Sequence, residues 1–170
     1  VTAAPNGANT MAVFSGIHPE TGEGYVYLET VGGGGGGRSG KDGKDGVQTG
    51  ITNTSNLPVE AIEQEYPLLV EEYGLVPGSG GSGKHKGGRG IRRVVSPVGH
   101  TCIFNGVGER FLMEPWGVFG GENGKSGRFA MRQADGSETA LPPKTGNRDL
   151  KPDQAAIFES PGAGGYGKRT

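Results

Sequence analysis

The sequence predicts an α+β fold that is predominantly β, with many short antiparallel strands, glycine- and proline-rich turns and one short helix. Three observations lead to this prediction. The 170 residues include 36 glycines and 11 prolines but are only 32% hydrophobic, so the core has to be spread over short segments. Short apolar runs recur between turn residues along the whole chain. Helical spacing is confined to one brief stretch, and we therefore expect a single β-rich segment over residues 1–170.

The first strands are predicted from residues 11–31. MAVFSGI and YVYLETV flank the turn HPETGEG, and the second run places Tyr25, Tyr27 and Glu29 on one face with the period of two expected of a strand. Strand character returns in VQTGITNTSN, LLVEEYGLV (68–76), IRRVVSPV, HTCIFNGV, RFLMEPW, RFAMRQADGSETAL and AAIFESPG, with GENGKSG and ADGS as tight hairpin turns. Strands at this spacing predict a sandwich or barrel-like assembly.

The predicted helix covers residues 58–66. Pro58 suits its first turn, where a backbone N–H has no partner within the helix. Glu60 and Glu63 lie in its first turns, where the helix dipole favours acidic side chains. Pro67 ends the helix, because a proline ring clashes with the preceding helical turn.

Glycine-rich loops are predicted at 32–46 and 78–90. The run GGGGGG at 32–37 lacks Cβ atoms, so it can pass close to a ligand or a neighbouring backbone, at a high cost in conformational entropy. We interpret it as a flexible loop that closes over an ordered polar cluster. A plain surface connection and a disordered linker explain the same composition, and the sequence leaves these alternatives open.

The second loop carries motif matches that its context does not support. GSGGSGKH at 78–85 has the spacing of phosphate-binding loops, but His85 stands where a Ser or Thr would bind Mg²⁺, and no helix follows. The basic run between Lys84 and Arg93 has no interleaved aromatic residue, and the formal net charge of the chain is −1. We therefore expect a solvated loop, or one that meets an acidic partner surface, and no nucleic-acid partner.

Cysteine and histidine usage narrows the function classes. Cys102 is the single cysteine and sits in an apolar run, where it is expected to be a small core residue rather than a nucleophile. His18, His85 and His100 are far apart in the sequence, so no metal site is predicted in this chain. The lone cysteine favours a reducing, cytoplasmic location, and no run of 18 apolar residues predicts a membrane span.

The polar cluster after the first glycine loop supplies the candidate site residues. Asn53 and Glu60 are the candidate catalytic residues, because an amide offers both a donor and an acceptor and a carboxylate can act as a base. Asp45, Asn56 and Glu63 are the candidate substrate-binding residues. Helix capping and turn formation explain the same side chains without any chemistry. No cofactor-binding residue is predicted.

Four blocks of the sequence resemble the C-terminal part of the hydantoinase B/oxoprolinase family. They are ETVGGGGGGRSGKDGKDGVQTGITNTSNLPVEAIEQEYPLLVEEYGL, GSGGSGKHKGGRGIRR, EPWGVFGGENGKSGR and SPGAGGYGKR, and they follow one another in the family's order over nearly the full chain. Ala163 in the last block departs from the usual glycine, and Gly50 stands where some relatives carry a histidine.

This resemblance implies a portion of an N-methylhydantoinase B-type subunit, not catalytic alone, in an ATP-dependent hydrolase of small cyclic amides such as hydantoins, 5-oxoproline or lactams. It implies a hydantoinase A-type partner subunit, which binds ATP and Mg²⁺ and phosphorylates the substrate. It also implies, as a second partner, the remainder of the B-type subunit, whose N-terminal region holds a divalent metal in some members. Related ketone carboxylases that act on acetone or acetophenone, and a purely structural segment of such a complex, are the alternatives.

Overall fold

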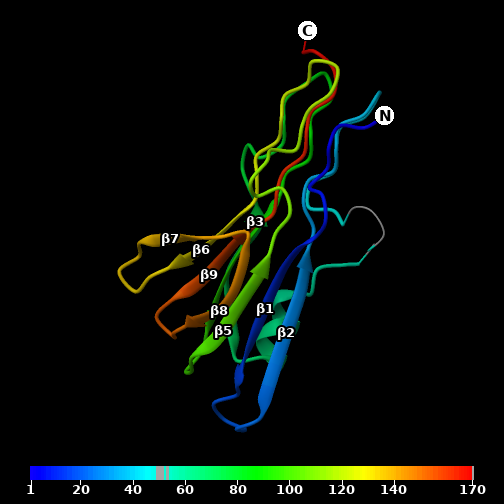
Figure 1. Cartoon of the computed structure of the whole chain (residues 1–170). Coiled ribbons are helices and arrows are strands. Elements are labelled where there is room, and N and C mark those ends of the chain that lie inside the picture. The colour runs from blue at the N-terminus through cyan, green and yellow to red at the C-terminus, as the bar shows by residue number, and fades with distance from the viewer. Residues whose placement is uncertain (49–51, 53, 170) are drawn as a thin grey trace.

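Two antiparallel sheets pack face to face in the computed structural model, which describes residues 1–48, 52 and 54–169 (Figure 1). The first sheet has the strand order β2-β1-β5-β8 and the second has the order β3-β4-β9-β6-β7. The strands of the first are β1 (Thr10–Ile17), β2 (Gly24–Val31), β5 (Cys102–Val107) and β8 (Lys144–Leu150). Those of the second are β3 (Leu68–Leu75), β4 (Ile91–Pro97), β6 (Arg128–Arg132), β7 (Glu138–Leu141) and β9 (Ala155–Glu159). The predicted β-rich fold class is therefore confirmed.

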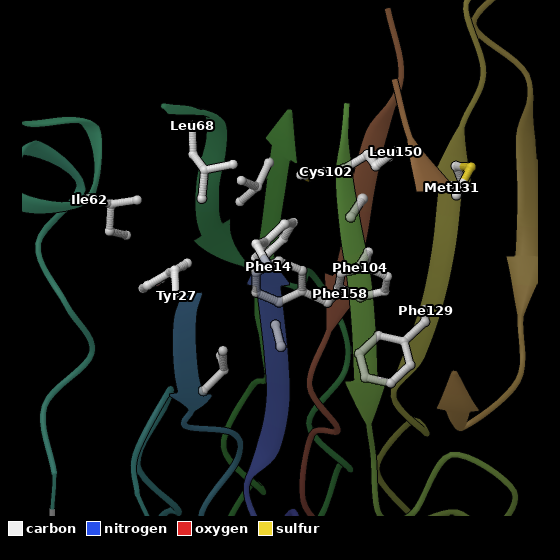
Figure 2. Packing of buried hydrophobic residues seen from close by; sticks show 14 of the residues in the cluster. Phe14, Tyr27, Ile62, Leu68, Cys102, Phe104, Phe129, Met131, Leu150 and Phe158 are labelled. Atoms are coloured by element: carbon white, nitrogen blue, oxygen red, sulfur yellow. The ribbon is translucent and has the colours of Figure 1, made fainter. Parts of the chain in front are cut away.

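The core lies between the two sheets and is centred on four phenylalanines (Figure 2). Phe14 and Phe104 come from the first sheet, and their ring centroids are 5.2 Å apart. The ring centroid of Phe158, in the second sheet, lies 6.3 Å from that of Phe14. The ring centroid of Phe129 lies 5.9 Å from that of Phe104, in an edge-on arrangement. Each ring is fully or almost fully buried. Aromatic pairs at these spacings add attraction to the burial of their area, so they fix how the sheets face each other.

The hairpin and helix signals of the first half of the chain are confirmed, whereas the strand predicted in VQTGITNTSN is not found in its described residues 47, 48, 52 and 54–56. The β1–β2 hairpin pairs Thr10 with Val31 through to Ile17 with Gly24, and its inward face includes the buried Tyr27 and Glu29. Helix α1 (Val59–Glu65) follows Pro58 and ends at Glu65, with Tyr66 as its C-cap just before Pro67. Its one buried side chain, Ile62, closes the core beside Tyr27 and Leu68 (Figure 2).

One strand prediction of the second half is wrong, and one strand was not predicted. The run RFLMEPW at 110–116 forms bends and irregular backbone, because Phe111 packs on Phe129 with ring centroids 4.7 Å apart and Arg110, at φ 56°, stacks on Trp116. Strand β8 has no alternating apolar pattern, and the sequence did not predict it. It lies at the edge of its sheet and buries only Thr145 and Leu150, so little hydrophobic patterning is required.

Backbone packs against backbone in the narrow upper part of the molecule in Figure 1, which we call the glycine bundle. It comprises residues 2–6, 32–47, 78–90, 115–125 and 160–167. Residues 32–34 and 37 are buried within it, so the prediction of a flexible glycine loop is wrong. GENGKSG also belongs to the bundle and is not a hairpin turn, whereas ADGS is the turn between β6 and β7.

Hydrogen bonds between the bundle segments repeat every three residues. Gly34 and Gly37 donate their N–H groups to the carbonyls of Pro161 and Gly164, each at 3.0 Å. With the same three-residue step, the N–H groups of residues 162 and 165 donate to the carbonyls of residues 125 and 122, respectively. The N–H groups of residues 122 and 125 in turn donate to the carbonyls of residues 82 and 79. A three-residue period of hydrogen bonds between neighbouring segments is typical of extended, polyproline II-like chains. Residues 32–47 and 78–90 also fold back on themselves, with Gly35 donating to the Lys44 carbonyl and Gly87 to the Gly81 carbonyl, each at 2.8 Å. The bundle is thus an ordered array in which neighbouring segments satisfy each other's backbone groups.

The close spacing of the segments explains the glycines. A Cβ at Gly34 would overlap the carbonyl oxygen of Gly88 and lie 2.6 Å from the nitrogen of Ala163. At Gly43 it would lie 2.7 Å from the nitrogen of Gly88. Neither glycine has a positive φ, so absence of a side chain, rather than an unusual backbone conformation, is what these positions require.

Substitution of Gly34 by alanine should therefore lower the free energy of unfolding by at least about 3 kcal/mol, because the backbone atoms that the new Cβ meets have no room to move. Gly74→Ala is the matched control, since a Cβ there meets nothing within 4 Å and φ is not positive. It should change stability by less than about 0.5 kcal/mol. Urea and thermal unfolding measure both, and equal effects would contradict the packing argument.

Candidate functional site

A hollow of about 790 Å³ lies where the glycine bundle meets residues 54–56 and β3. The bundle supplies most of its wall through backbone atoms and through side chains of the first glycine loop. Gln48, residues 54–56 and Tyr73 supply the remainder. Within residues 1–48, 52 and 54–169, the lining is Thr2, Pro5, Gly35, Gly36, Arg38, Asp42, Gly43, Lys44, Gly46, Val47, Gln48, Thr54, Ser55, Asn56 and Tyr73.

The polar groups of the hollow suit a small anionic or amide-bearing molecule. Arg38 and Lys44 are exposed cations on its wall, opposed by one acid, Asp42. The amides of Gln48 and Asn56 each offer a donor and an acceptor. Cations with neutral donors are the groups that proteins use to bind carboxylates and phosphates.

Asn56 is the predicted site residue that the structure places in this wall. Its Oδ1 accepts hydrogen bonds from the N–H of Gly32 and from Nε2 of Gln48, both at 3.3 Å, and its Nδ2 donates to the Tyr73 hydroxyl at 3.0 Å. Gln48 Nε2 also donates to the Thr30 carbonyl at 2.7 Å. Asn56 is thereby fixed between the end of β2, the bundle and β3.

A buried ion pair holds the segment that carries Asn56. The guanidinium of Arg93 donates to the carboxylate of Glu29, and both side chains are almost completely buried. The pair binds both backbone groups of Leu57: Arg93 donates to its carbonyl at 2.9 Å, and Glu29 accepts from its N–H at 3.1 Å. Arg93 also lies 4.0 Å from the centroid of the Tyr73 ring, a cation–π contact.

Burial dominates the protonation of this cluster. It raises the pKa of the Glu29 carboxyl, while Arg93, the Tyr27 hydroxyl and the Leu57 N–H oppose that shift by stabilising the carboxylate. Burial also raises the pKa of the Tyr27 phenol, and the adjacent Glu29 adds to this. Tyr27 therefore stays protonated and donates its hydroxyl hydrogen to Glu29.

Asp45 fastens the two glycine loops to each other. Its carboxylate accepts a hydrogen bond from the backbone N–H of Arg89 at 2.7 Å. It also accepts from the guanidinium Nε and Nη2 of Arg89, at 3.0 and 2.7 Å. These hydrogen bonds lower the pKa of Asp45. Asp45 lines a smaller hollow of about 280 Å³ beside Tyr73, and its bonds to Arg89 favour a structural role over the predicted substrate contact.

The remaining predicted site residues are not brought together with Asn56. Glu60 and Glu63 are exposed on α1 and line neither hollow. Glu63 accepts from the N–H of Val70 at 2.9 Å, which ties α1 to β3. Asn53 lies outside the described residues, so its predicted role stays a prediction.

Sequence reasoning missed the other side chains of the hollow, Arg38, Lys44, Gln48 and Tyr73. A useful signal was the alternation of Arg38, Asp42 and Lys44 among glycines, which places several charges on a segment with few other side chains. The expectation of a solvated basic run between Lys84 and Arg93 is wrong at Arg93, which is buried against Glu29, whereas Arg89 is exposed and pairs with Asp45 at the surface.

The described part of the chain holds neither a metal cluster nor a long apolar helix. Across residues 1–48, 52 and 54–169, no three His, Cys, Asp or Glu side chains lie close enough together to hold a metal ion. Within those same ranges, no helix has the length and apolar character needed to cross a membrane. Cys102 is buried as expected, and burial raises the pKa of its thiol to about 11.

Comparison with known proteins gives a family match over almost the whole chain. The family model for hydantoinase B/oxoprolinase matches residues 1–169. An uncharacterised protein of Methanocaldococcus jannaschii is 41% identical over 169 residues, which cover 98% of this chain and 28% of the relative. A 5-oxoprolinase of Dictyostelium discoideum is 33% identical over 143 residues, or 84% of this chain and 11% of the relative. A caprolactamase subunit beta of Pseudomonas jessenii is 34% identical over 113 residues, which cover 64% of this chain and 19% of the relative.

Two solved structures share the fold. The ATP-dependent caprolactamase of Pseudomonas jessenii superposes with a TM-score of 0.82 at 23% identity, covering 99% of this chain and 30% of that one. An acetone carboxylase without nucleotide superposes with a TM-score of 0.83 at 17% identity, covering 98% and 26%. At these identities the likeness concerns the fold. The chain spans less than a third of the length of each of these relatives and structures.

The buried ion pair generates a stability prediction. Glu29→Gln should cost at least about 3 kcal/mol of unfolding free energy, because it leaves the Arg93 charge buried without a counterion, and Arg93→Met should cost a similar amount. The double variant should lose less than the two single variants added together. Urea unfolding of the four proteins measures this, and strict additivity would contradict coupling between the two side chains.

The Asp45–Arg89 contact predicts an acid-sensitive part of the stability. Because Arg89 lowers the pKa of Asp45, the contact stabilises the fold above the ordinary carboxyl pKa of about 3.9, and this stabilisation is lost as the pH falls through the lowered value. Asp45→Asn should lower the unfolding free energy by about 1 kcal/mol at pH 7, a modest value because the pair is partly exposed.

Unfolding at pH 7 and pH 3 measures the effect. The difference between the parent protein and Asp45→Asn should shrink at pH 3. Asp153→Asn, at an exposed position, serves as the control and should leave the unfolding free energy unchanged at both pH values. A constant difference for Asp45→Asn at the two pH values would contradict the argument.

Proposed function

Because this chain belongs to the hydantoinase B/oxoprolinase family, we propose that it is the C-terminal portion of a B-type subunit in an ATP-dependent enzyme that opens cyclic amides. The match of the family model to residues 1–169 carries the proposal. Two relatives above 30% identity are named 5-oxoprolinase and caprolactamase subunit beta, so their names refer to a cyclic amide and to a multi-subunit enzyme. The chain is not catalytic alone in this proposal.

The chemistry is divided between polypeptides. We assign ATP and Mg²⁺ to a hydantoinase A-type partner, which activates the amide oxygen by phosphorylation, and any divalent metal to the remainder of the B-type subunit. This chain contributes a wall of the site. Its hollow, with Arg38, Lys44 and the amide of Asn56, has the charge and the donors to hold an anionic, activated or ring-opened amide.

A ketone carboxylase of the same superfamily is the second candidate. The superposition on acetone carboxylase favours it, but at 17% identity this likeness concerns the fold. Cyclic amide opening is the first candidate because the relatives with closer sequences carry amide-hydrolase names. A scaffold role, in which all chemistry lies elsewhere in the complex, predicts that the hollow and α1 tolerate substitution.

The assembly can be tested by purifying the chain with an affinity tag from its source and identifying the polypeptides that accompany it. The proposal expects a subunit with an ATP site and the remainder of a B-type subunit. The purified material should open hydantoin, 5-oxoproline or caprolactam only when ATP is present. Acetone and bicarbonate in place of the amide test the second candidate. A folded chain that purifies without partners would overturn the proposal.

Asn53→Ala and Glu60→Ala, introduced into that assembly, should lower kcat at least about tenfold, because each removes a polar group proposed to act in a part of the active centre that the other polypeptides complete. Glu60 is exposed and lines neither hollow of this chain, so its partner in this proposal comes from the assembly. Gln64→Ala, on the exposed surface of α1, is the matched control and should leave kcat unchanged. Subunit composition is checked by native mass spectrometry for each variant. Full turnover in correctly assembled Asn53 and Glu60 variants would assign this segment a scaffold role.

A further inference from the structure

The outer faces of the two sheets differ in the side chains that cover them. On the second sheet, arginines and glutamates from neighbouring strands form ion pairs over an apolar row. Val94, Ala130 and Ile157 of that row are at most 2% exposed. The pairs that cover this face are Arg92 with Glu72, Glu138 and Glu159, Arg128 with Glu138 and Glu159, and Arg132 with Glu71. This face is complete without a partner.

In the part of the chain that the structure describes, no ion pairs cover strands β1, β2 and β5 on the outer side of the first sheet. Val26 and Leu28 of β2 are 66% and 56% exposed, and Ile103 and Val107 of β5 are 38% and 44% exposed. These side chains point away from the core, because the alternate residues of the same strands are buried. Ile17, at the end of β1, lies on the same side and is 60% exposed, so five large aliphatic side chains are in contact with water on one side of one sheet.

The pairing register joins these side chains into one surface. Leu28 lies opposite Val13 of β1, and Ser15 lies between Val26 and Ile103. Directly opposed residues on a sheet are near enough for their side chains to touch. We call this surface the outer apolar face. Its apolar members are Met11, Val13, Ile17, Val26, Leu28, Ile103 and Val107, and Ser15, Thr30 and Asn105 lie among them.

Charged residues border this face on one side. On β8, Lys144 lies opposite Val107 and Asp149 lies opposite Ile103. An apolar centre with a charged border is the composition of a lasting protein interface rather than of a surface that stays in water. On the side of β2 the apolar residues continue to the edge of the sheet.

We propose that the outer apolar face is the surface on which the remainder of the B-type subunit packs. The proposal rests on the proposed function. The superposition on caprolactamase uses 99% of this chain but only 30% of that chain, so more than two thirds of a structurally similar protein has no counterpart here. A polypeptide of that size supplies enough apolar surface to bury the face, as a domain core is buried.

Cysteine accessibility in the purified assembly tests the proposal. Cys102 is the single native cysteine and is 1% exposed, so an introduced thiol is the one that reacts with a maleimide. Leu28→Cys should react at least tenfold more slowly than Ala140→Cys, which places a thiol on the exposed edge strand β7 of the second sheet. Both should react equally in urea. Equal rates in the native assembly would overturn the proposal.

A photo-reactive amino acid at Val26 identifies the occupant. Irradiation of the assembly followed by peptide sequencing should give cross-links to a B-type region outside the 170 residues of this chain. Cross-links to a second copy of these residues, to the A-type partner or to lipid would each overturn the proposal. Ring opening is assayed on the same preparations. A reactive Leu28→Cys in an active assembly refutes the interface alone, whereas inactivity of the unmodified assembly refutes the proposed function.

A charge placed on the face provides the second variant. Leu28→Glu points away from the core, so the sandwich should stay folded by circular dichroism while the yield of accompanying B-type polypeptide falls at least tenfold. Ala140→Glu is the matched control and should retain the partner. Retention of the partner by Leu28→Glu at the level of the control would contradict the proposed surface.

Discussion

Direct contact between backbones in the glycine bundle is the constraint on which the rest of the molecule depends. Segments far apart in the sequence approach so closely that a Cβ at Gly34 or Gly43 would collide with a neighbouring main chain. The stabilisation comes from hydrogen bonds that repeat every three residues, not from apolar side chains. This explains how a chain with only 32% hydrophobic residues builds an ordered structure as long as the one in Figure 1. The sandwich supplies the conventional core, and the bundle extends from it.

The Arg93–Glu29 pair connects these two parts. It lies between the sheets, yet it holds Leu57 by both backbone groups, and the preceding Asn56 is bonded to Gly32 at the start of the bundle. A buried charge pair is costly to desolvate, and its retention fits a role in fixing position more than a role in raising stability. The hollow is therefore built on a rigid support, as a binding site requires.

The sequence predicted those parts of the fold that side-chain patterns encode. Alternation identified the inward Tyr27 and Glu29, and Pro58 with Pro67 bounded α1. Strand β8 was not predicted, because an edge strand needs little hydrophobic patterning. The glycine bundle was not predicted either, because backbone hydrogen bonds with a three-residue period leave no side-chain pattern beyond glycine itself. For the candidate site, Asn56 was placed on the hollow, but Arg93 was taken for a surface charge. Ile91, Arg93 and Val95 share one face of β4, and this spacing was the signal that could have placed Arg93 in the core.

The bundle also determines when the protein can finish folding. Gly34 is bonded to Pro161 and lies against Gly88, so its surroundings are complete only after the last of these segments has been synthesised. Contacts across such sequence separations form slowly, because ordering glycine-rich chain over long loops is opposed by a large entropy loss. The β1–β2 hairpin, whose strands are joined by a short turn, can form as soon as residue 31 leaves the ribosome. Until the bundle closes, its glycine segments are unpaired strands of backbone, which makes this stage the one most open to proteolysis and to association with chaperones.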